Sequence, residues 1–232
     1  MKKVKALFTY FSKAELTLWL CSLSVILISF LCFDRENYLT LTASLIGVSS
    51  LIFCAKGNPV GQVLMIIFSL FYGYISYGFT YYGEMVTYLG MTLPMSVISL
   101  VSWLKNPYKG SKSEVAVNHI KKRELPFLLL LTLAVTVAFY FILQHFGTAN
   151  LFPSTISVAT SFAAAYLTFR RSPFFALVYA LNDVVLIVLW ILATVKDLSY
   201  LSVIICFTVF LVNDLYGFFN WRKMEKLQKN NT

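Results

Sequence analysis

Residues 151–195 read LFPSTISVATSFAAAYLTFRRSPFFALVYALNDVVLIVLWILATV, two apolar runs separated by the basic turn Arg170-Arg171-Ser172. The runs, 151–169 and 173–195, are each close to the ~20 residues with which an α-helix crosses the ~30 Å hydrocarbon core of a bilayer. Two such runs joined by a short basic turn are typical of a helical hairpin inserted in a membrane. The stretch therefore indicates a membrane protein.

The rest of the chain repeats this pattern. Hydrophobic residues make up 59% of the sequence and charged residues 12%, with a mean hydropathy of +0.75, which excludes an ordinary soluble domain. We therefore predict an all-α integral membrane protein with eight transmembrane helices. The six further apolar runs are 15–33, 38–55, 59–82, 84–104, 125–146 and 198–220.

The basic residues alternate between the gaps. Seventeen of the nineteen Lys and Arg residues fall in every second gap, and only Arg35 and Lys196 fall in the others. By the positive-inside rule, both termini are predicted to be cytoplasmic in a multi-pass protein of the cell membrane. The net charge of +9 is then assigned to contact with anionic lipid headgroups, and no nucleic-acid partner is expected. The seventeen are Lys2, Lys3, Lys5, Lys13, Lys56, Lys105, Lys109, Lys112, Lys121, Lys122, Arg123, Arg170, Arg171, Arg222, Lys223, Lys226 and Lys229.

Signatures of other classes of protein are missing from the sequence. The four cysteines lie inside apolar runs without metal-ligand spacing, and no glycine-rich phosphate loop or nucleophile–base pair is evident. We therefore expect no metal, no cofactor and no enzymatic activity. The basic residues of 2–5 precede an apolar run as in a signal peptide, but no small-residue cleavage site follows, so we expect a retained first helix.

Two basic turns suggest an internal repeat. Residues 55–59 and 169–173 each place Pro at the first position of a helix, and they lie 114 positions apart. At this offset the helix boundaries coincide, so 38–106 is predicted to be one triple-helix bundle and 151–221 another, with a linking helix in 125–150. One linking helix makes the repeats parallel, which is the 3+1+3 layout of SWEET-type transporters. The remaining parts are an N-terminal segment with the first helix (1–37), a basic cytoplasmic loop (107–124) and a cytoplasmic tail (222–232).

Polar side chains inside the apolar runs are candidates for substrate binding, because such groups are costly in hydrocarbon. Asn182-Asp183 lies in the middle of the seventh run, on a helix face with Phe175 and Tyr179, and Asn213 lies in the eighth. Amides and aromatic faces suit a flat ring that carries hydroxyl groups. Bonds that only hold neighbouring helices together are the structural alternative. The complete candidate set is Gln62, Tyr88, Ser99, Trp103, Phe175, Tyr179, Asn182, Asp183, Phe210 and Asn213.

The chain resembles the PnuC-type vitamin and nucleoside transporters over roughly residues 40–223. The likeness rests on Gly61, Tyr82-Gly83-Glu84-Met85, Trp103 and the closing stretch 213–221, NDLYGFFNW. It implies a SWEET-like homotrimer that imports nicotinamide riboside by alternating-access facilitated diffusion, with a cytoplasmic kinase trapping the product. Carriers of this family show Trp-x-x-Trp-x-x-x-Asn in the run matching 173–195. Here Asn182 matches the Asn, but Phe175 and Val178 stand in the Trp positions.

Our hypothesis is that the ring stacks on Phe175 and Tyr179, while Asn182 and Asn213 bind the ribose or the amide. Asp183 either fixes the orientation of these two asparagines or favours a cationic ring. The site would open alternately on the Tyr81–Met85 side and on the basic side. Alternatives are a deoxynucleoside, thiamine or flavin carrier, a sugar or amino-acid carrier, a proton- or sodium-coupled symporter, and a non-transporting subunit of a larger complex. Pro94 is expected to kink the fourth run, because proline cannot donate the helical hydrogen bond.

Overall fold

The computed structural model describes residues 10–78, 82–195 and 200–230. Within these residues, eight helices are long and apolar enough to cross a membrane, which confirms the predicted number of spans. Tyr81 and Lys196, and the terminal Lys2, Lys3 and Lys5, lie outside the described residues.

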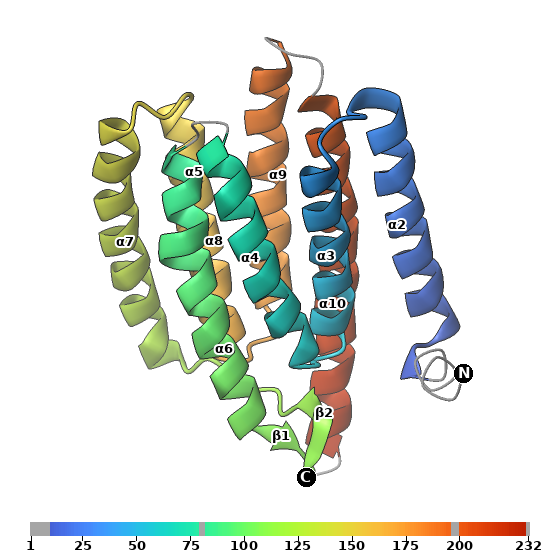
Figure 1. The fold of residues 1–232 in the computed structure, drawn as a ribbon. Helices are drawn as coiled ribbons and strands as arrows, with labels where there is room; N and C mark the ends of the chain where they lie inside the picture. Colours follow the sequence, from blue (N-terminus) through green and yellow to red (C-terminus); the bar gives the residue numbers. More distant parts are fainter. Residues whose placement is uncertain (1–9, 79–81, 196–199, 231–232) are drawn as a thin grey trace.

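Figure 1 shows the helices standing side by side as one bundle. The start of α2, the end of α10 and the β1–β2 hairpin lie at one end of the bundle, here called the hairpin end. The turn between α7 and α8 lies at the other end, called the far end. The helices are α2 (Lys13–Phe33), α3 (Tyr38–Ala55), α4 (Val60–Gly78), α5 (Tyr82–Thr87), the π-helical turn η1 (Tyr88–Thr92), α6 (Leu93–Lys105), the short 3-10 turn η2 (Lys122–Glu124), α7 (Leu125–His145), α8 (Leu151–Phe169), α9 (Phe175–Thr194) and α10 (Leu201–Asn230); the strands are β1 (Pro107–Tyr108) and β2 (Ser111–Val115).

Six helices form a closed ring of neighbours. In order around the ring, α3 contacts α4, α4 contacts α6, α6 contacts α8, α8 contacts α9, α9 contacts α10, and α10 contacts α3. Helix α7 packs on α8 from outside, and α2 packs on α3 and α10, so that α7 and α2 occupy opposite edges of the bundle (Figure 1). The ring therefore encloses the space in which a site for a small solute can lie.

Small residues let the helices of the ring approach closely, as is usual where helices pack inside a bilayer. A Cβ atom added to Gly61 of α4 would lie 2.5 Å from Sγ and 2.6 Å from the backbone N of Cys54 on α3. The Ser50 hydroxyl donates a hydrogen bond to the Gly61 carbonyl at 2.9 Å in the same contact. The α3–α4 crossing thus depends on the missing side chain.

Helices α3 and α8 end in the same kind of turn. Gly57 and Arg171 both adopt left-handed backbone, with φ of 65° and 58°. The following amide donates back to the helix in each case, Asn58 N to Phe53 O at 3.0 Å and Ser172 N to Leu167 O at 3.0 Å. Such a left-handed residue is a common helix terminator, and glycine adopts it without steric cost.

The loop after α6 forms a β-hairpin and then crosses the hairpin end of the ring. Lys109 and Gly110, with φ of 48° and 76°, make the two-residue turn, and positive φ at both positions suits the twist of the strands. Val115 N donates to Gly57 O at 3.0 Å, and Asn118 N donates to Arg171 O at 3.0 Å. Residues 115–118, called the strap, therefore contact the turns that end α3 and α8.

Helix α10 is longer than its apolar run, which ends at residue 220, and continues to Asn230. The added turns bury Trp221, Met224 and Gln228. Gln228 accepts a hydrogen bond from Val117 N at 2.8 Å and donates to Val115 O at 3.1 Å. The apolar pattern measures only the part of a helix inside hydrocarbon, and contact with the strap stabilises the remainder.

Candidate functional site

The ring encloses a cavity of about 100 Å³ that runs from the middle of the bundle toward the far end. Its walls come from α3, α4, α5, η1, α8, α9 and α10, with Leu143 of α7 and Thr148 at the far end. Five of the ten candidate residues lie in the lining: Tyr88, Tyr179, Asn182, Asp183 and Phe210.

The other five candidates lie outside the lining. Trp103 and Phe175 pack with Trp221 in a buried cluster at the hairpin end. Gln62 donates to Cys54 Sγ at 3.3 Å, within the α3–α4 contact. Asn213 donates from Nδ2 to the Ser22 hydroxyl of α2 at 2.9 Å, on the outer side of the ring. Ser99 is buried on α6, which contributes no residue to the lining among the described residues.

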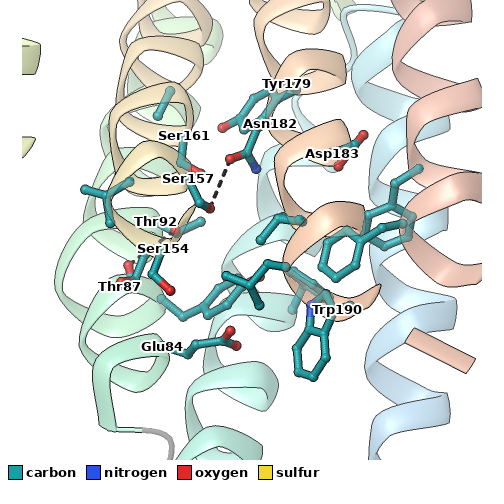
Figure 2. A pocket seen from close by; sticks show the side chains of 18 of the residues that line it. Glu84, Thr87, Thr92, Ser154, Ser157, Ser161, Tyr179, Asn182, Asp183 and Trp190 are labelled. Carbon is teal, nitrogen blue, oxygen red and sulfur yellow. Dashed lines mark hydrogen bonds between the residues drawn. The ribbon is translucent and has the colours of Figure 1, made fainter. Parts of the chain in front are cut away.

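Asn182 is fixed by two hydroxyl groups of the neighbouring helix α8. Its Oδ1 accepts hydrogen bonds from Ser157 Oγ at 3.1 Å and from Thr160 Oγ1 at 2.8 Å. Figure 2 shows the resulting orientation, with the amide oxygen toward Ser157 and the amide nitrogen turned toward the centre of the cavity. Since an amide nitrogen carries two donor hydrogens, Asn182 presents hydrogen-bond donors to whatever occupies the cavity.

Hydroxyl groups of α8 and α5 form a second polar wall that the sequence argument missed. Ser154, Ser157 and Ser161 line the cavity at spacings of three and four, which place them on one face of α8. Thr87 lines it from α5, with Glu84 nearer the far end (Figure 2). The spacing of small hydroxyl residues within the apolar run 151–169 could have indicated this polar face of α8.

A π-helical turn places further groups in the cavity. Residues Tyr88–Thr92 widen the fourth run just before Pro94, and Leu93 N donates to Tyr88 O, five residues back. Thr92 Oγ1 donates to Thr87 O at 3.3 Å. A kink was expected at Pro94, and the structure has this π-helical turn directly before it. Such turns are frequent at functional sites, and here one carries Tyr88 and Thr92 into the lining.

Aromatic rings line the α4, α9 and α10 sides of the cavity. Tyr88 lies 5.9 Å from Phe68, and Phe68 lies 6.1 Å from Phe210, measured between ring centroids. Helix α9 contributes Tyr179 and, toward the far end, Trp190. Phe175, which stands in the first Trp position of the family pattern, lies behind Tyr179, with ring centroids 6.3 Å apart. The aromatic surface that α9 presents to the cavity is therefore formed by Tyr179 and Trp190.

Two carboxyl groups meet where α9 and α10 border the cavity. Asp183 and Asp214 are 4% and 6% exposed, and both line the cavity. Asp183 Oδ2 is buried and has no hydrogen-bond partner among the described residues. The ion pairs found among the described residues involve other acidic residues. Within the described part of the chain, the carboxyl pair thus lies in an apolar bundle with no ion pair to a Lys, Arg or His side chain.

The sequence matches a family model described as nicotinamide mononucleotide transporter over residues 37–223. It is 25% identical to the nicotinamide riboside transporter PnuC of Neisseria mucosa over 224 residues, covering 94% of this chain and 83% of that protein. It is 24% identical to the nicotinamide riboside transporter PnuC of Haemophilus influenzae over 192 residues, covering 82% of each chain.

A solved structure shares the fold. The crystal structure of the vitamin B3 transporter PnuC superimposes with a TM-score of 0.80 over 94% of each chain, at 24% sequence identity. The matched family and the similar proteins are transporters, which confirms the class inferred from the sequence.

Proposed function

This chain belongs to the nicotinamide mononucleotide transporter family and is a multi-pass membrane transporter, and we propose that it imports nicotinamide riboside. That solute is the one named for both curated relatives. The observation that carries the proposal is the uncompensated carboxyl pair beside aromatic rings in the central cavity.

Nicotinamide riboside contains a pyridinium ring with a permanent positive charge. A buried carboxyl group without a cation is costly in a membrane, and a cationic ligand removes that cost. Aromatic faces attract a cationic ring further, through the negative charge density above the ring plane. In our proposal the pyridinium ring lies between Tyr88, Tyr179 and Phe210, within reach of Asp183.

Hydrogen bonds complete the proposed site. The Asn182 amide nitrogen donates to the ribose or to the carboxamide oxygen of the ligand, while Ser157 and Thr160 keep the amide oriented. Ser161 and Thr87 supply hydroxyl groups for the ribose. Phe175 supports Tyr179 from behind, and Asn213 fixes α10 against α2.

We further propose that the fold consists of two parallel triple-helix repeats, α3–α4–α6 and α8–α9–α10. Crosswise hydrogen bonds support this arrangement. Trp103 Nε1 of the first repeat donates to Thr168 O at 2.9 Å, and Trp221 Nε1 of the second donates to Cys54 O at 2.8 Å. The two acceptors are 114 positions apart, the offset of the basic turns, whereas the two donors are 118 apart.

A second crosswise pair has the same relation. Ser102 Oγ donates to Phe169 O at 2.8 Å, and Asn220 Nδ2 donates to Ala55 O at 2.8 Å. The third helix of the second repeat is therefore displaced by four residues from the ungapped offset, which corresponds to a longer connection between α9 and α10. The exchange of equivalent bonds is what a two-fold axis along the membrane normal would produce.

The same tryptophans support a direction of transport. Trp103 and Trp221 have ring centroids 5.4 Å apart, and Phe175 lies 4.9 Å from Trp221, so the hairpin end of the ring is closed by packed rings. The basic turns of the two repeats also lie at this end, which we therefore assign to the cytoplasm. In this conformation the cavity extends toward the outside, and alternating access requires the Trp103–Trp221 contact to separate.

We also propose that the protein is a homotrimer, that transport is facilitated diffusion, and that a cytoplasmic kinase traps the imported solute. All three are implied by the resemblance to the PnuC-type transporters. Without trapping, a carrier of this kind only equilibrates its solute. Uptake into proteoliposomes should therefore stop at the external concentration, and should continue when a nicotinamide riboside kinase and ATP are enclosed.

Tryptophan fluorescence of the purified protein tests the function directly, because Trp190 lines the cavity. The panel is nicotinamide riboside, thiamine, riboflavin, thymidine, deoxyadenosine and glucose. Saturable quenching by nicotinamide riboside at micromolar concentration, lost in Trp190→Phe while calorimetric binding persists, is the expected result. Binding of another member alone would transfer the proposal to that solute, and no binding by titration or calorimetry would favour a non-transporting subunit.

A further inference from the structure

A third carboxyl group lines the cavity, at the end opposite the Trp103–Trp221 contact. Glu84 lies on α5 near the far end, and Figure 2 shows its carboxyl group turned inward. The side chain is half-buried and takes part in none of the ion pairs found among the described residues. An acidic side chain that the protein leaves unpaired within a membrane-spanning segment is a candidate for function.

Close packing of α5 on the end of α7 fixes the position of Glu84. A Cβ atom added to the preceding Gly83 would overlap Thr148 Oγ1 and would lie 2.7 Å from Cδ2 of Leu143. The missing side chain therefore lets α5 lie directly against the far end of α7. Thr148 and Leu143 also line the cavity, so Glu84 is placed at its rim on the far-end side.

Trp190 of α9 lies at a similar depth along the bundle and lines the same cavity (Figure 2). Its ring packs on Tyr200, with centroids 5.2 Å apart. Trp190 follows Asp183 by seven residues, which corresponds to about 10 Å along a helix axis. A single pyridinium ring is shorter than this distance, so a ring that contacts Trp190 does not contact Asp183. The cavity thus has two levels at which a carboxyl group and an aromatic ring lie together.

We propose that Glu84 and Trp190 form an outer site, which captures the cationic solute before it moves to the inner site at Asn182 and Asp183. The inference rests on the proposed function, since it requires a cationic solute that enters from the far end. At the outer site the positive charge lies beside the Glu84 carboxylate while the ring lies against Trp190, and tryptophan attracts cations most strongly among the aromatic side chains. The solute leaves the outer site when it reaches the inner one. The outer site therefore speeds entry and exit alike and leaves the equilibrium affinity to the inner site.

Stopped-flow tryptophan fluorescence of the detergent-purified protein mixed with nicotinamide riboside measures the rate of capture. In Glu84→Gln the association and dissociation rate constants should both fall, by roughly three- to tenfold at low ionic strength. High ionic strength should remove most of the difference from the wild type, because salt screens the attraction at the rim. The dissociation constant from calorimetry should stay within about twofold of the wild-type value.

Two further variants show whether the charge of Glu84 is the cause. Glu84→Asp keeps the carboxylate and should retain most of the wild-type rate. Glu36→Gln removes an exposed carboxylate from the turn between α2 and α3, at the same end of the bundle but outside the cavity lining, and should bind at the wild-type rate. A wild-type rate in Glu84→Gln, or an equal loss in Glu84→Asp and Glu84→Gln, would overturn the inference. A weaker affinity of Glu84→Gln with an unchanged association rate would place Glu84 in the inner site and would overturn it as well.

The wild-type protein provides a test that needs no variant. Its association rate should fall as the ionic strength rises, and a rate that is independent of salt would overturn the inference even if Glu84→Gln did not fold. The proposed function fails separately, if calorimetry detects no binding of nicotinamide riboside to the wild type. Normal binding together with unchanged capture rates in Glu84→Gln would refute the outer site alone.

Discussion

Replacing Asn182 with Ala separates ligand binding from helix packing when it is compared with the same change at Asn213. Both asparagines are buried in membrane helices, at 6% and 2% exposure, and both bond a neighbouring helix. They differ in where the side chain lies, since Asn182 lines the cavity while Asn213 contacts Ser22 of α2.

The size of the effect follows from the hydrogen bonds. Asn182→Ala removes a donor to the ligand and leaves a ligand acceptor unsatisfied in a buried site, which costs about 2 kcal/mol. That is roughly a 30-fold increase in the dissociation constant. The effect on folding is smaller, because the Thr160 hydroxyl can still donate its hydrogen to the carbonyl of Ile156 at 3.0 Å or to that of Ser157 at 3.1 Å. Loss of an interhelical bond of this kind costs about 1 kcal/mol.

The assay is calorimetric titration with nicotinamide riboside, together with thermal unfolding of the same samples in detergent. Asn213→Ala should lower the unfolding temperature by a few degrees and leave the dissociation constant within about twofold. Ser157→Ala should weaken binding less than Asn182→Ala, because Thr160 still holds the amide. If Asn213→Ala impairs binding as much as Asn182→Ala, or if Asn182→Ala binds normally, the assignment of the Asn182 amide to the ligand is wrong.

Two further predictions concern the frame around the site. Gly61→Ala should sharply reduce the yield of folded protein, because its Cβ would overlap the Cys54 backbone, whereas Gly90→Ala, whose nearest neighbour would be at 3.7 Å, should purify normally on size-exclusion chromatography. Lys56→Met should destabilise the protein by about 3 kcal/mol, because it leaves the buried Glu15 carboxylate without the ammonium group that lies 2.9 Å away. In thermal unfolding, the double variant with Glu15→Gln should recover most of the lost stability. An unchanged unfolding temperature in Lys56→Met would show that the ion pair does not stabilise the fold.

The positions of the spans were predictable from the sequence, since a run of apolar residues must match the thickness of hydrocarbon. Helices α3 and α8 have the same ends as their apolar runs. The extension of α10 past residue 220 was not predictable in this way, because charged residues interrupt the pattern although contact with the strap keeps the chain helical.

The candidate site was partly predictable for a related reason. Asn182 and Asp183 stand out in the middle of an apolar run, and both lie at the cavity. The rotation of a helix that is apolar on all sides is not encoded in its own pattern, so the outward direction of Asn213 depends on its neighbours. The hydroxyl residues of α8 were missed because Ser and Thr commonly bond their own helix, and only the packed structure brings Ser157 to Asn182.

The strap has a kinetic consequence. It bonds Gly57 at the end of α3, Arg171 at the end of α8 and Gln228 on α10, so any separation of these elements must break some of its hydrogen bonds. Opening toward the hairpin end is such a separation, and its rate then depends on residues that never contact the solute. Changes confined to residues 115–118 can therefore alter turnover while the affinity of the cavity stays the same.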